Sequence, residues 1–505
     1  MRRLPLTLLS ALIVVSTALS PSLIQAEESK VKKLTGIFKR DGDSKESKKE
    51  IKASKRPDLR ALFAENETQT LLEKFWGENK QLEVEDEWHQ LIQEHSRTAR
   101  QYNQSALYAN PNIQAFVNNL GQSLIPREAD REVILTFKIL QDPVPEVYAL
   151  STGTVFITTG MLSMMENESQ LAFVLAHEAG HILANHHLLE VVTQNKKETR
   201  SKLTGMVLNA MSDSGVASGE EAFLAAAIYG MASAYGSVKF SEKLEKEADL
   251  IALELTLRHE YDIRDSESLI AELGRISRNS SPEVGLSFAS NPYMLEKRAK
   301  TIGTHLKVAF QPAIDKVLDQ EGFKLASPRY NQLMSEVKRD NGYWALQSDL
   351  FAIAKSNLES AAEIRTDDPY TMYSLGLLYR AIARSPEDRF KAVRYFKSAV
   401  QFDSGRHQFP AAHLQYAVEL INMDDPGVST EIQHHLKTYV TLFQRQNKGN
   451  LPPEMHFVYD YLALSGEKGW VALPVTNIST GYPYQYTGDA SIDTLSSTPL
   501  KSGKL

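Results

Sequence analysis

The feature that most constrains this chain is an HExxH motif formed by His177, Glu178 and His181. On an α-helix, residues four positions apart lie on one face, so both imidazoles can point at a single metal ion. Glu178 lies one position further round the helix, close to a water molecule at that ion. Two neutral nitrogen ligands and a carboxylate base are what a hydrolytic zinc site needs. The alternative is a pair of surface histidines on a solvated helix.

The residues around the motif favour a buried helix. Asn167 precedes Gln170 by three positions, which is typical of a helix start. Gly180 keeps one side of this helix thin, so we expect another element to approach it closely. Buried imidazoles need partners, which favours metal binding over a surface location. Apolar residues recur at helical spacing at Leu171, Val174, Leu175, Ile182 and Leu183.

A third ligand is expected from an acidic segment further along the chain. In a helix, Glu245 and Asp249 share a face, whereas Glu247 points away. Glu245 is the better candidate ligand, and Asp249 is then placed to accept a hydrogen bond from a ligand histidine and fix its tautomer. The alternative is that these acids form an ordinary solvated helix face with the neighbouring lysines.

The motif HEAGH, followed downstream by Glu245 and an EAD triplet ending at Asp249, resembles the membrane-linked zinc peptidases. These include the HtpX-type proteases, the CAAX prenyl proteases and the periplasmic BepA-type β-barrel assembly-enhancing proteases. The resemblance extends over roughly residues 60–310 and implies a zincin-type catalytic domain. It also implies that His177, His181 and Glu245 bind one Zn²⁺ per chain, with Glu178 as the base. Further matches lie at 148–150, 153–158 and 160–162.

Two positions in a later loop and helix bear on substrate binding or gating. Relatives of this type often carry a histidine before a proline, and this chain has Asn291 there. Asparagine is a poor zinc ligand, which puts gating of the metal by this loop in doubt. Arg298 follows at the expected spacing, and we expect it to form an ion pair rather than to bind substrate. If the motif helix continues, it turns His186 and His187 away from the metal, so both are interpreted as structural or surface residues.

The N-terminus has the pattern of a secretory signal peptide over residues 1–26, with two arginines before an apolar run. An uncleaved anchor is the alternative. Cysteine is absent, which excludes a lipid-modified N-terminal Cys and a disulfide framework. These features fit the bacterial periplasm best. A net charge of −7, with both signs spread along the chain, argues against nucleic acid as a partner.

The remaining chain divides by composition. Residues 27–56 are rich in charge and serine and are expected to form a disordered linker. A metallopeptidase domain is expected over 57–325, with helices at 68–75 and 84–107 and strands at 133–141 and 146–158. Within it, Leu203–Val238 is apolar and is interpreted as core helices. A flap or a peripheral membrane contact is the alternative for this segment.

After residue 325 the pattern changes to paired amphipathic helices resembling tetratricopeptide repeats. In one unit, Gly376 and Phe396 occupy the positions at which such repeats place small and large residues. A weaker earlier unit includes Leu358, and a third pair spans about 410–423 and 428–444. We therefore expect a helical repeat solenoid over 326–465 and a flexible tail over 466–505, the alternative being an unrelated helical bundle. The predicted fold is α+β, mostly α.

These features predict a periplasmic zinc endopeptidase that docks to a partner through its repeats. The resemblance implies misassembled outer-membrane β-barrel proteins as substrates and the β-barrel assembly machinery as the docking partner. A second hypothesis is a chaperone or assembly factor that acts mainly through its repeats, with weak or conditional proteolysis. A third is a scaffold that binds no metal.

Overall fold

The computed structural model describes residues 55–68, 70–71, 81–126, 134–195, 240–279, 292–320, 322–324, 327–403 and 408–466. The expected signal peptide, most of the expected linker, Leu203–Val238 and Asn291 lie outside these ranges, as does the expected tail beyond residue 466. In the described part of the chain, no helix is long and apolar enough to cross a membrane.

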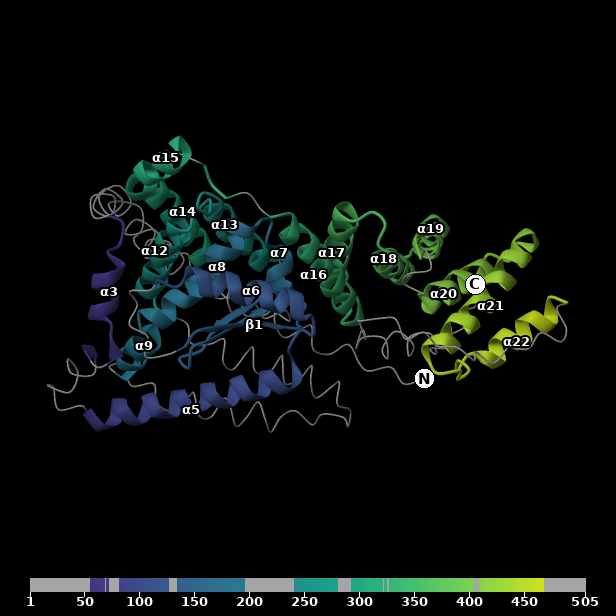
Figure 1. Cartoon of the computed structure of the whole chain (residues 1–505), viewed down its shortest axis with the longest axis horizontal. Helices are drawn as coiled ribbons and strands as arrows, with labels where there is room; N and C mark the ends of the chain where they lie inside the picture. Colours follow the sequence, from purple (N-terminus) through teal and green to yellow (C-terminus); the bar gives the residue numbers. More distant parts are fainter. Residues whose placement is uncertain are drawn as a thin grey trace, which may run out of the picture.

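The N-terminal part combines helices with one small sheet (Figure 1). Its elements in chain order are α3 (Leu59–Glu65), α5 (Gln81–Ser105), α6 (Pro111–Leu124), β1 (Thr136–Leu140), β2 (Val147–Ala149), β3 (Thr154–Thr158), α7 (Thr159–Met164), α8 (Glu168–Leu183), α9 (His186–Asn195), α12 (Glu242–Arg258), α13 (Asp265–Asn279), α14 (Pro292–His305), a π-turn η1 (Leu306–Phe310) and α15 (Gln311–Asp319).

The sheet has the strand order β1-β3-β2, with β1 parallel and β2 antiparallel to β3. The expected strand over 146–158 is wrong as a single strand, because the chain reverses between β2 and β3. Gly153 makes this turn with φ of +92°, a left-handed conformation that glycine adopts without strain, and its N–H donates to the Leu150 carbonyl at 2.9 Å. The strand expected over 133–141 is present as β1.

Helix α8 carries the HExxH motif and begins where the sequence predicts. Asn167 is its N-cap, and the Asn167 Oδ1 atom accepts a hydrogen bond from the Gln170 N–H at 2.9 Å. Nearly every residue of this helix is buried. Helix α12 packs along it, and a Cβ added to Gly180 would lie 3.2 Å from the Ile251 Cγ2 atom. The element that approaches the thin side of the motif helix is therefore α12.

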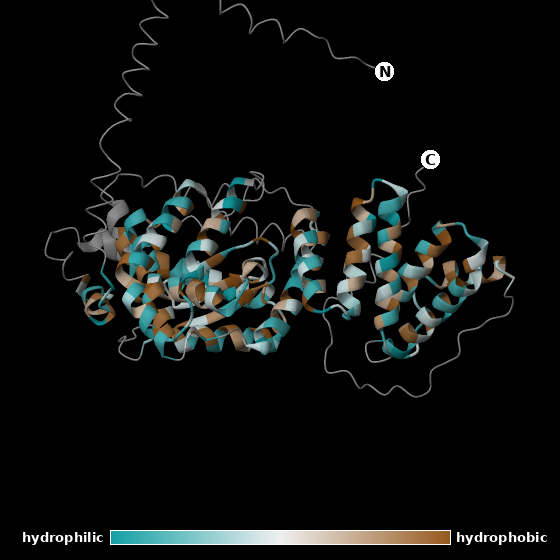
Figure 2. Cartoon of the chain, turned by 90° about the horizontal axis from the view of Figure 1, so that it is seen from above, coloured by the Kyte–Doolittle hydropathy of each residue, from teal (hydrophilic) through white to brown (hydrophobic). Residues whose placement is uncertain are grey.

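The C-terminal part is built of helix pairs, as the sequence predicts. Figure 2 shows hydrophilic and hydrophobic residues alternating along these helices, as expected for amphipathic packing. Their bounds are α16 (Pro328–Gln347), α17 (Phe351–Ile364), α18 (Pro369–Ile382), α19 (Pro386–Phe402), α20 (Pro410–Asn422), a 3₁₀ turn η2 (Pro426–Val428), α21 (Ser429–Gln446) and α22 (Met455–Leu464).

Close contact within the pairs depends on small residues. A Cβ added to Gly376 in α18 would lie 2.6 Å from the Phe396 ring in α19, and one added to Gly342 in α16 would lie 2.6 Å from Leu358 in α17. Both large side chains are fully buried. The observed arrangement is a helical, repeat-like region in which each pair packs on the next.

Helix α16 belongs to the cores of both parts. Tyr330 and Val337 pack into the core around the sheet, whereas Tyr343 and Leu346 pack among the C-terminal helices. The Tyr108 hydroxyl donates to Asp340 Oδ2 at 2.6 Å and ties the middle of α16 to the N-terminal part. The expected boundary near residue 325 stays a prediction. The mostly helical composition with a small sheet agrees with the expected fold class.

Candidate metal centre

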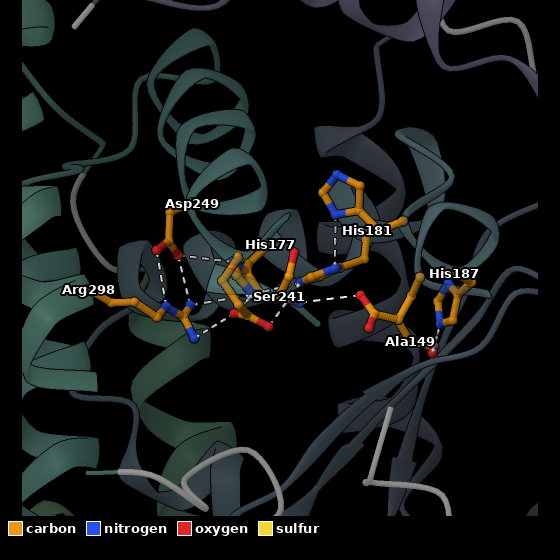
Figure 3. Close-up of polar contacts among 10 residues, drawn as sticks. Ala149, His177, His181, His187, Ser241, Asp249 and Arg298 are labelled. Atoms are coloured by element: carbon orange, nitrogen blue, oxygen red, sulfur yellow. Dashed lines mark hydrogen bonds and ion pairs between the residues drawn. The ribbon is translucent and has the colours of Figure 1, made fainter. Parts of the chain in front are cut away.

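Helix α8 brings the two motif histidines together. Their Nε2 atoms lie 3.1 Å apart, and the side chains of His177 and His181 are buried (Figure 3). The spacing of four residues places both rings on one face, where the rings meet edge to face. This arrangement excludes the alternative of two solvated surface histidines.

Glu245 completes a group of three. It lies in the first turn of α12, and its carboxylate oxygens lie 3.5 Å from His177 Nε2 and 3.9 Å from His181 Nε2. One ligand atom from each residue lies within 4.8 Å of the other two, so the group could hold a metal ion.

The donor set fits zinc. Ligand atoms about 2.0 Å from a tetrahedral zinc are separated by roughly 3.3 Å. The observed separations are 3.1 Å between the two Nε2 atoms, and 3.5 and 3.9 Å from these nitrogens to the Glu245 oxygens. Two imidazole nitrogens and one carboxylate oxygen are also ligands that zinc accepts, and three protein ligands leave a fourth position for water or substrate.

Glu178 lies beside this group and is 5% exposed. The Ala149 backbone N–H at the end of β2 donates to its carboxylate. Burial raises the pKa of Glu178 to about 7, because the effect of burial outweighs that of the His177 charge, which lowers this pKa. A carboxyl with a pKa near neutrality can both accept and return a proton, which general acid–base chemistry requires.

With this geometry established, comparison with known proteins identifies the family. Residues 120–305 match the sequence model of peptidase family M48. This part of the chain is an M48 metallopeptidase domain.

Relatives of the M48 domain carry two kinds of name. The chain is 27% identical over 186 residues to the beta-barrel assembly-enhancing protease of Escherichia coli O157:H7, which covers 36% of this chain and 37% of the relative. It is also 27% identical over 163 residues to a putative beta-barrel assembly-enhancing protease of Vibrio cholerae, covering 32% of each. It is 29% identical over 164 residues to the mitochondrial metalloendopeptidase OMA1 of Schizosaccharomyces pombe, covering 32% of this chain and 44% of that protein. The matches thus span less than half the length of these relatives.

Asp249 and Arg298 lie beside His177 in the M48 domain (Figure 3). Asp249 Oδ1 is 3.1 Å from His177 Nδ1, the contact expected for a carboxylate that fixes a ligand tautomer. Arg298 lies 2.7 Å from Asp249 Oδ1 and 2.8 Å from Glu245 Oε2, and its side chain is buried. Arg298 therefore forms ion pairs, as the sequence predicts.

Charge pairing controls the protonation of this cluster. Burial alone raises the pKa of Asp249, but the Arg298 charge outweighs it and holds that pKa well below its ordinary range. Burial and Arg298 lower the pKa of His177, but Asp249 and Glu245 outweigh them and raise it to about 9. A metal ion at His177 therefore has to displace a proton.

His186 and His187 were expected to turn away from the metal position on a continuation of the motif helix. That expectation is wrong because the helix does not continue. Helix α8 ends at Leu183, and Asn185 turns the chain with φ of +51° before α9 begins at His186. Both histidines are buried. His187 Nε2 donates to the Ala149 carbonyl at 2.9 Å, and His186 returns to contact His181.

Sequence reasoning also missed Phe240. Its ring stacks on the His181 ring, with centroids 3.9 Å apart and planes 20° from parallel. It also meets His187 edge to face at 5.1 Å. Phe240 covers one face of a candidate ligand and limits the orientation of that ring. A single aromatic residue before a helix carries no sequence signal for such a contact.

Proposed function

We propose that this chain is a zinc-dependent endopeptidase in which His177, His181 and Glu245 hold one Zn²⁺. The observation that supports this most directly is the meeting of these three side chains from α8 and α12, with Glu178 buried beside them. Asn291, which puts gating of the metal by its loop in doubt, lies outside the described residues.

Each side chain around the ion has a separate task in this proposal. Zinc, when bound, supplies a Lewis acid that polarises a peptide carbonyl and acidifies water. Glu178 takes the proton of the attacking water and passes it to the leaving amine. Asp249 holds the Nδ1 proton of His177, which leaves Nε2 free to act as a ligand. Arg298 neutralises the buried carboxylate of Asp249 and the part-buried carboxylate of Glu245.

The proposed substrates are misassembled outer-membrane β-barrel proteins, and the proposed compartment is the bacterial periplasm. Similarity to proteins named beta-barrel assembly-enhancing protease supports this choice. The apolar segment after the N-terminal arginines supports export. Substrates of this class expose extended chain, which a peptidase can bind without strict sequence preference.

We propose that the C-terminal helices form a tetratricopeptide-like solenoid that docks the peptidase at the β-barrel assembly machinery. The support is structural: successive pairs of helices stack on one another, and Gly376 lies against Phe396 as a repeat of this kind requires. Among the described residues, the one group of side chains suited to a metal lies outside these helices. Their role in this proposal is binding.

Incubation of the purified full chain with a urea-unfolded β-barrel protein tests the proposal. Wild type is expected to cleave it, chelator treatment to stop cleavage, and added zinc to restore it. Glu178→Gln is expected to bind the same substrate without cutting it, so that crosslinking and mass spectrometry identify what is trapped in cells.

The same variant separates the peptidase from an assembly factor. If Glu178→Gln restores outer-membrane integrity fully in a strain lacking the protein, chaperone activity of the repeats is favoured over proteolysis. If it fails while the protein is present at normal levels, proteolysis is the essential activity.

A further inference from the structure

The two candidate ligand histidines each have a second ring nitrogen that faces away from the metal position. For His177 this atom is Nδ1, and Asp249 lies 3.1 Å from it. For His181 the facing atom belongs to another histidine: His186 Nδ1 lies 3.0 Å from His181 Nδ1. The rings meet edge to face, with centroids 4.9 Å apart. His186 is fully buried, so water does not compete for this contact.

The turn between α8 and α9 makes this contact possible. Asn185 adopts the left-handed conformation at φ of +51°, and its side-chain amide donates to the Asn66 carbonyl at 2.7 Å. This hydrogen bond ties the turn to the segment after α3. The chain thereby reverses within a few residues of His181, and the first residue of α9 packs against the motif.

The protonation of these rings follows from the chemistry of a ligand. A neutral imidazole that binds a metal through Nε2 carries its proton on Nδ1. The His181 Nδ1–H must therefore donate, and His186 Nδ1 must accept. The remaining proton of His186 then resides on Nε2, which needs an acceptor of its own.

Glu247 lies on that side. Its Oε1 atom is 4.0 Å from His186 Nε2 and accepts a hydrogen bond from the Asn66 side-chain amide at 3.3 Å. Glu247 points away from the metal position, as its place on α12 predicts, but toward His186. The same helix therefore offers Glu245 to the metal position, Asp249 to His177 and Glu247 to His186.

We propose that His186 is a positioning residue that fixes the Nδ1–H tautomer and the ring orientation of His181, with Glu247 holding the far side of His186. This inference rests on the proposed zinc site. His186 and Glu247 together do for His181 what Asp249 does for His177. Partners behind a ligand histidine typically change metal affinity by about 10- to 100-fold when removed.

Three variants of the full chain test the proposal. His186→Leu removes the acceptor, whereas His186→Asn places an amide oxygen near the position of Nδ1 and keeps it. His187→Leu is the matched control, because His187 is an adjacent buried histidine that contacts the Ala149 carbonyl instead of a candidate ligand. The readouts are zinc affinity by chelator competition and the visible spectrum of the Co²⁺-substituted protein.

His186→Leu is expected to bind zinc about 10- to 100-fold more weakly than wild type and to show a shifted Co²⁺ spectrum. His186→Asn is expected to recover most of the affinity, and His187→Leu to keep all of it. Wild-type affinity in His186→Leu would overturn the proposal, and so would a loss in His186→Asn or His187→Leu as large as the loss in His186→Leu. A wild-type protein that binds no zinc would instead overturn the proposed function.

Glu247→Ala provides a test that does not open the core, because the Glu247 side chain is 23% exposed. It is expected to weaken zinc binding in the same direction, but less than His186→Leu does. Unchanged zinc affinity in Glu247→Ala would show that Glu247 does not help His186 to position His181. If His186→Leu fails to fold, unchanged zinc affinity in Glu247→Ala counts against the proposal.

Discussion

Arg298 donates two hydrogen bonds to Asp249, from Nη2 to Oδ1 at 2.7 Å and from Nε to Oδ2 at 3.1 Å, and both side chains are buried. The guanidinium also pairs with Glu245 at 2.8 Å. Arg298 therefore balances two carboxylates that the same helix places at the candidate metal centre. Loss of its charge has consequences for folding that are separable from catalysis.

Arg298→Met is expected to destabilise the metal-free protein by about 3–5 kcal/mol, because it leaves the buried carboxylate of Asp249 without its counter-charge. Urea unfolding in the presence of a chelator measures this. Arg275→Met is the control, since Arg275 pairs with Glu272 on an exposed helix face and its loss should leave the unfolding midpoint unchanged. Equal effects in the two variants would refute the buried-pair interpretation.

Glu178→Gln is expected to lower peptide hydrolysis by about 10²- to 10⁴-fold, because the amide cannot accept the proton of the attacking water. Glu178 is not one of the three candidate ligands, so zinc content should equal that of wild type. Metal analysis and hydrolysis are measured on the same sample. Substantial hydrolysis by a zinc-loaded variant would show that another group acts as the base.

Gly376→Ala is expected to destabilise the C-terminal helices by about 1–3 kcal/mol, because its Cβ would overlap the Phe396 ring. Phe396→Leu replaces the ring with a smaller aliphatic side chain and should relieve the overlap. A double-mutant cycle of urea unfolding free energies is then expected to be non-additive, with the double variant more stable than the sum of the single losses predicts. Strict additivity would mean that the two residues do not meet.

His95 gives a pH dependence remote from the metal. Its Nδ1 atom accepts the Ser151 backbone N–H at 2.9 Å, and burial lowers the pKa of His95 from 6.5 to about 4. His187, whose ring faces it from α9, is also held neutral by burial, which lowers its pKa to about 3. Because the pKa of His95 is lower in the folded protein than in the unfolded chain, the unfolded chain binds more protons at this residue between pH 4 and 6.5.

The His95 contribution to stability is therefore complete above pH 6.5 and is lost as pH falls from 6.5 toward 4. His95→Asn keeps an acceptor for Ser151 without titrating. It should reduce the slope of unfolding free energy against pH by up to about 1.4 kcal/mol per pH unit in this range. Urea unfolding at pH 7, 6 and 5 measures the slope, and an unchanged slope would contradict the assignment.

The grouping of side chains at the candidate metal centre was predictable from sequence because much of its information is local. Helical spacing alone places His177 and His181 on one face, and the same spacing selects Glu245 and Asp249 on the second helix. Family resemblance was needed to pair the two segments. A close approach of another element to Gly180 also followed from the absence of a side chain, although that element could not be named as α12.

The features that the sequence did not predict are two reversals of the chain, one between β2 and β3 and one between α8 and α9. The turn at Gly153 splits one expected strand into β2 and β3, which lie in two apolar runs on either side of the polar stretch 151–154. The turn at Asn185 ends the motif helix and brings His186 back to His181, against a pattern that favours a continuous helix. At each of these turns a single residue with positive φ redirects the chain.

Zinc content of Glu245→Ala tests the central claim most directly. Wild type is expected to retain one zinc per chain after dialysis, and Glu245→Ala to be largely empty and inactive while its helices remain folded. Glu242→Ala, one turn earlier on α12 and paired with Lys246 and Lys297, should keep wild-type zinc. Full zinc occupancy and undiminished peptide hydrolysis in Glu245→Ala would contradict the account.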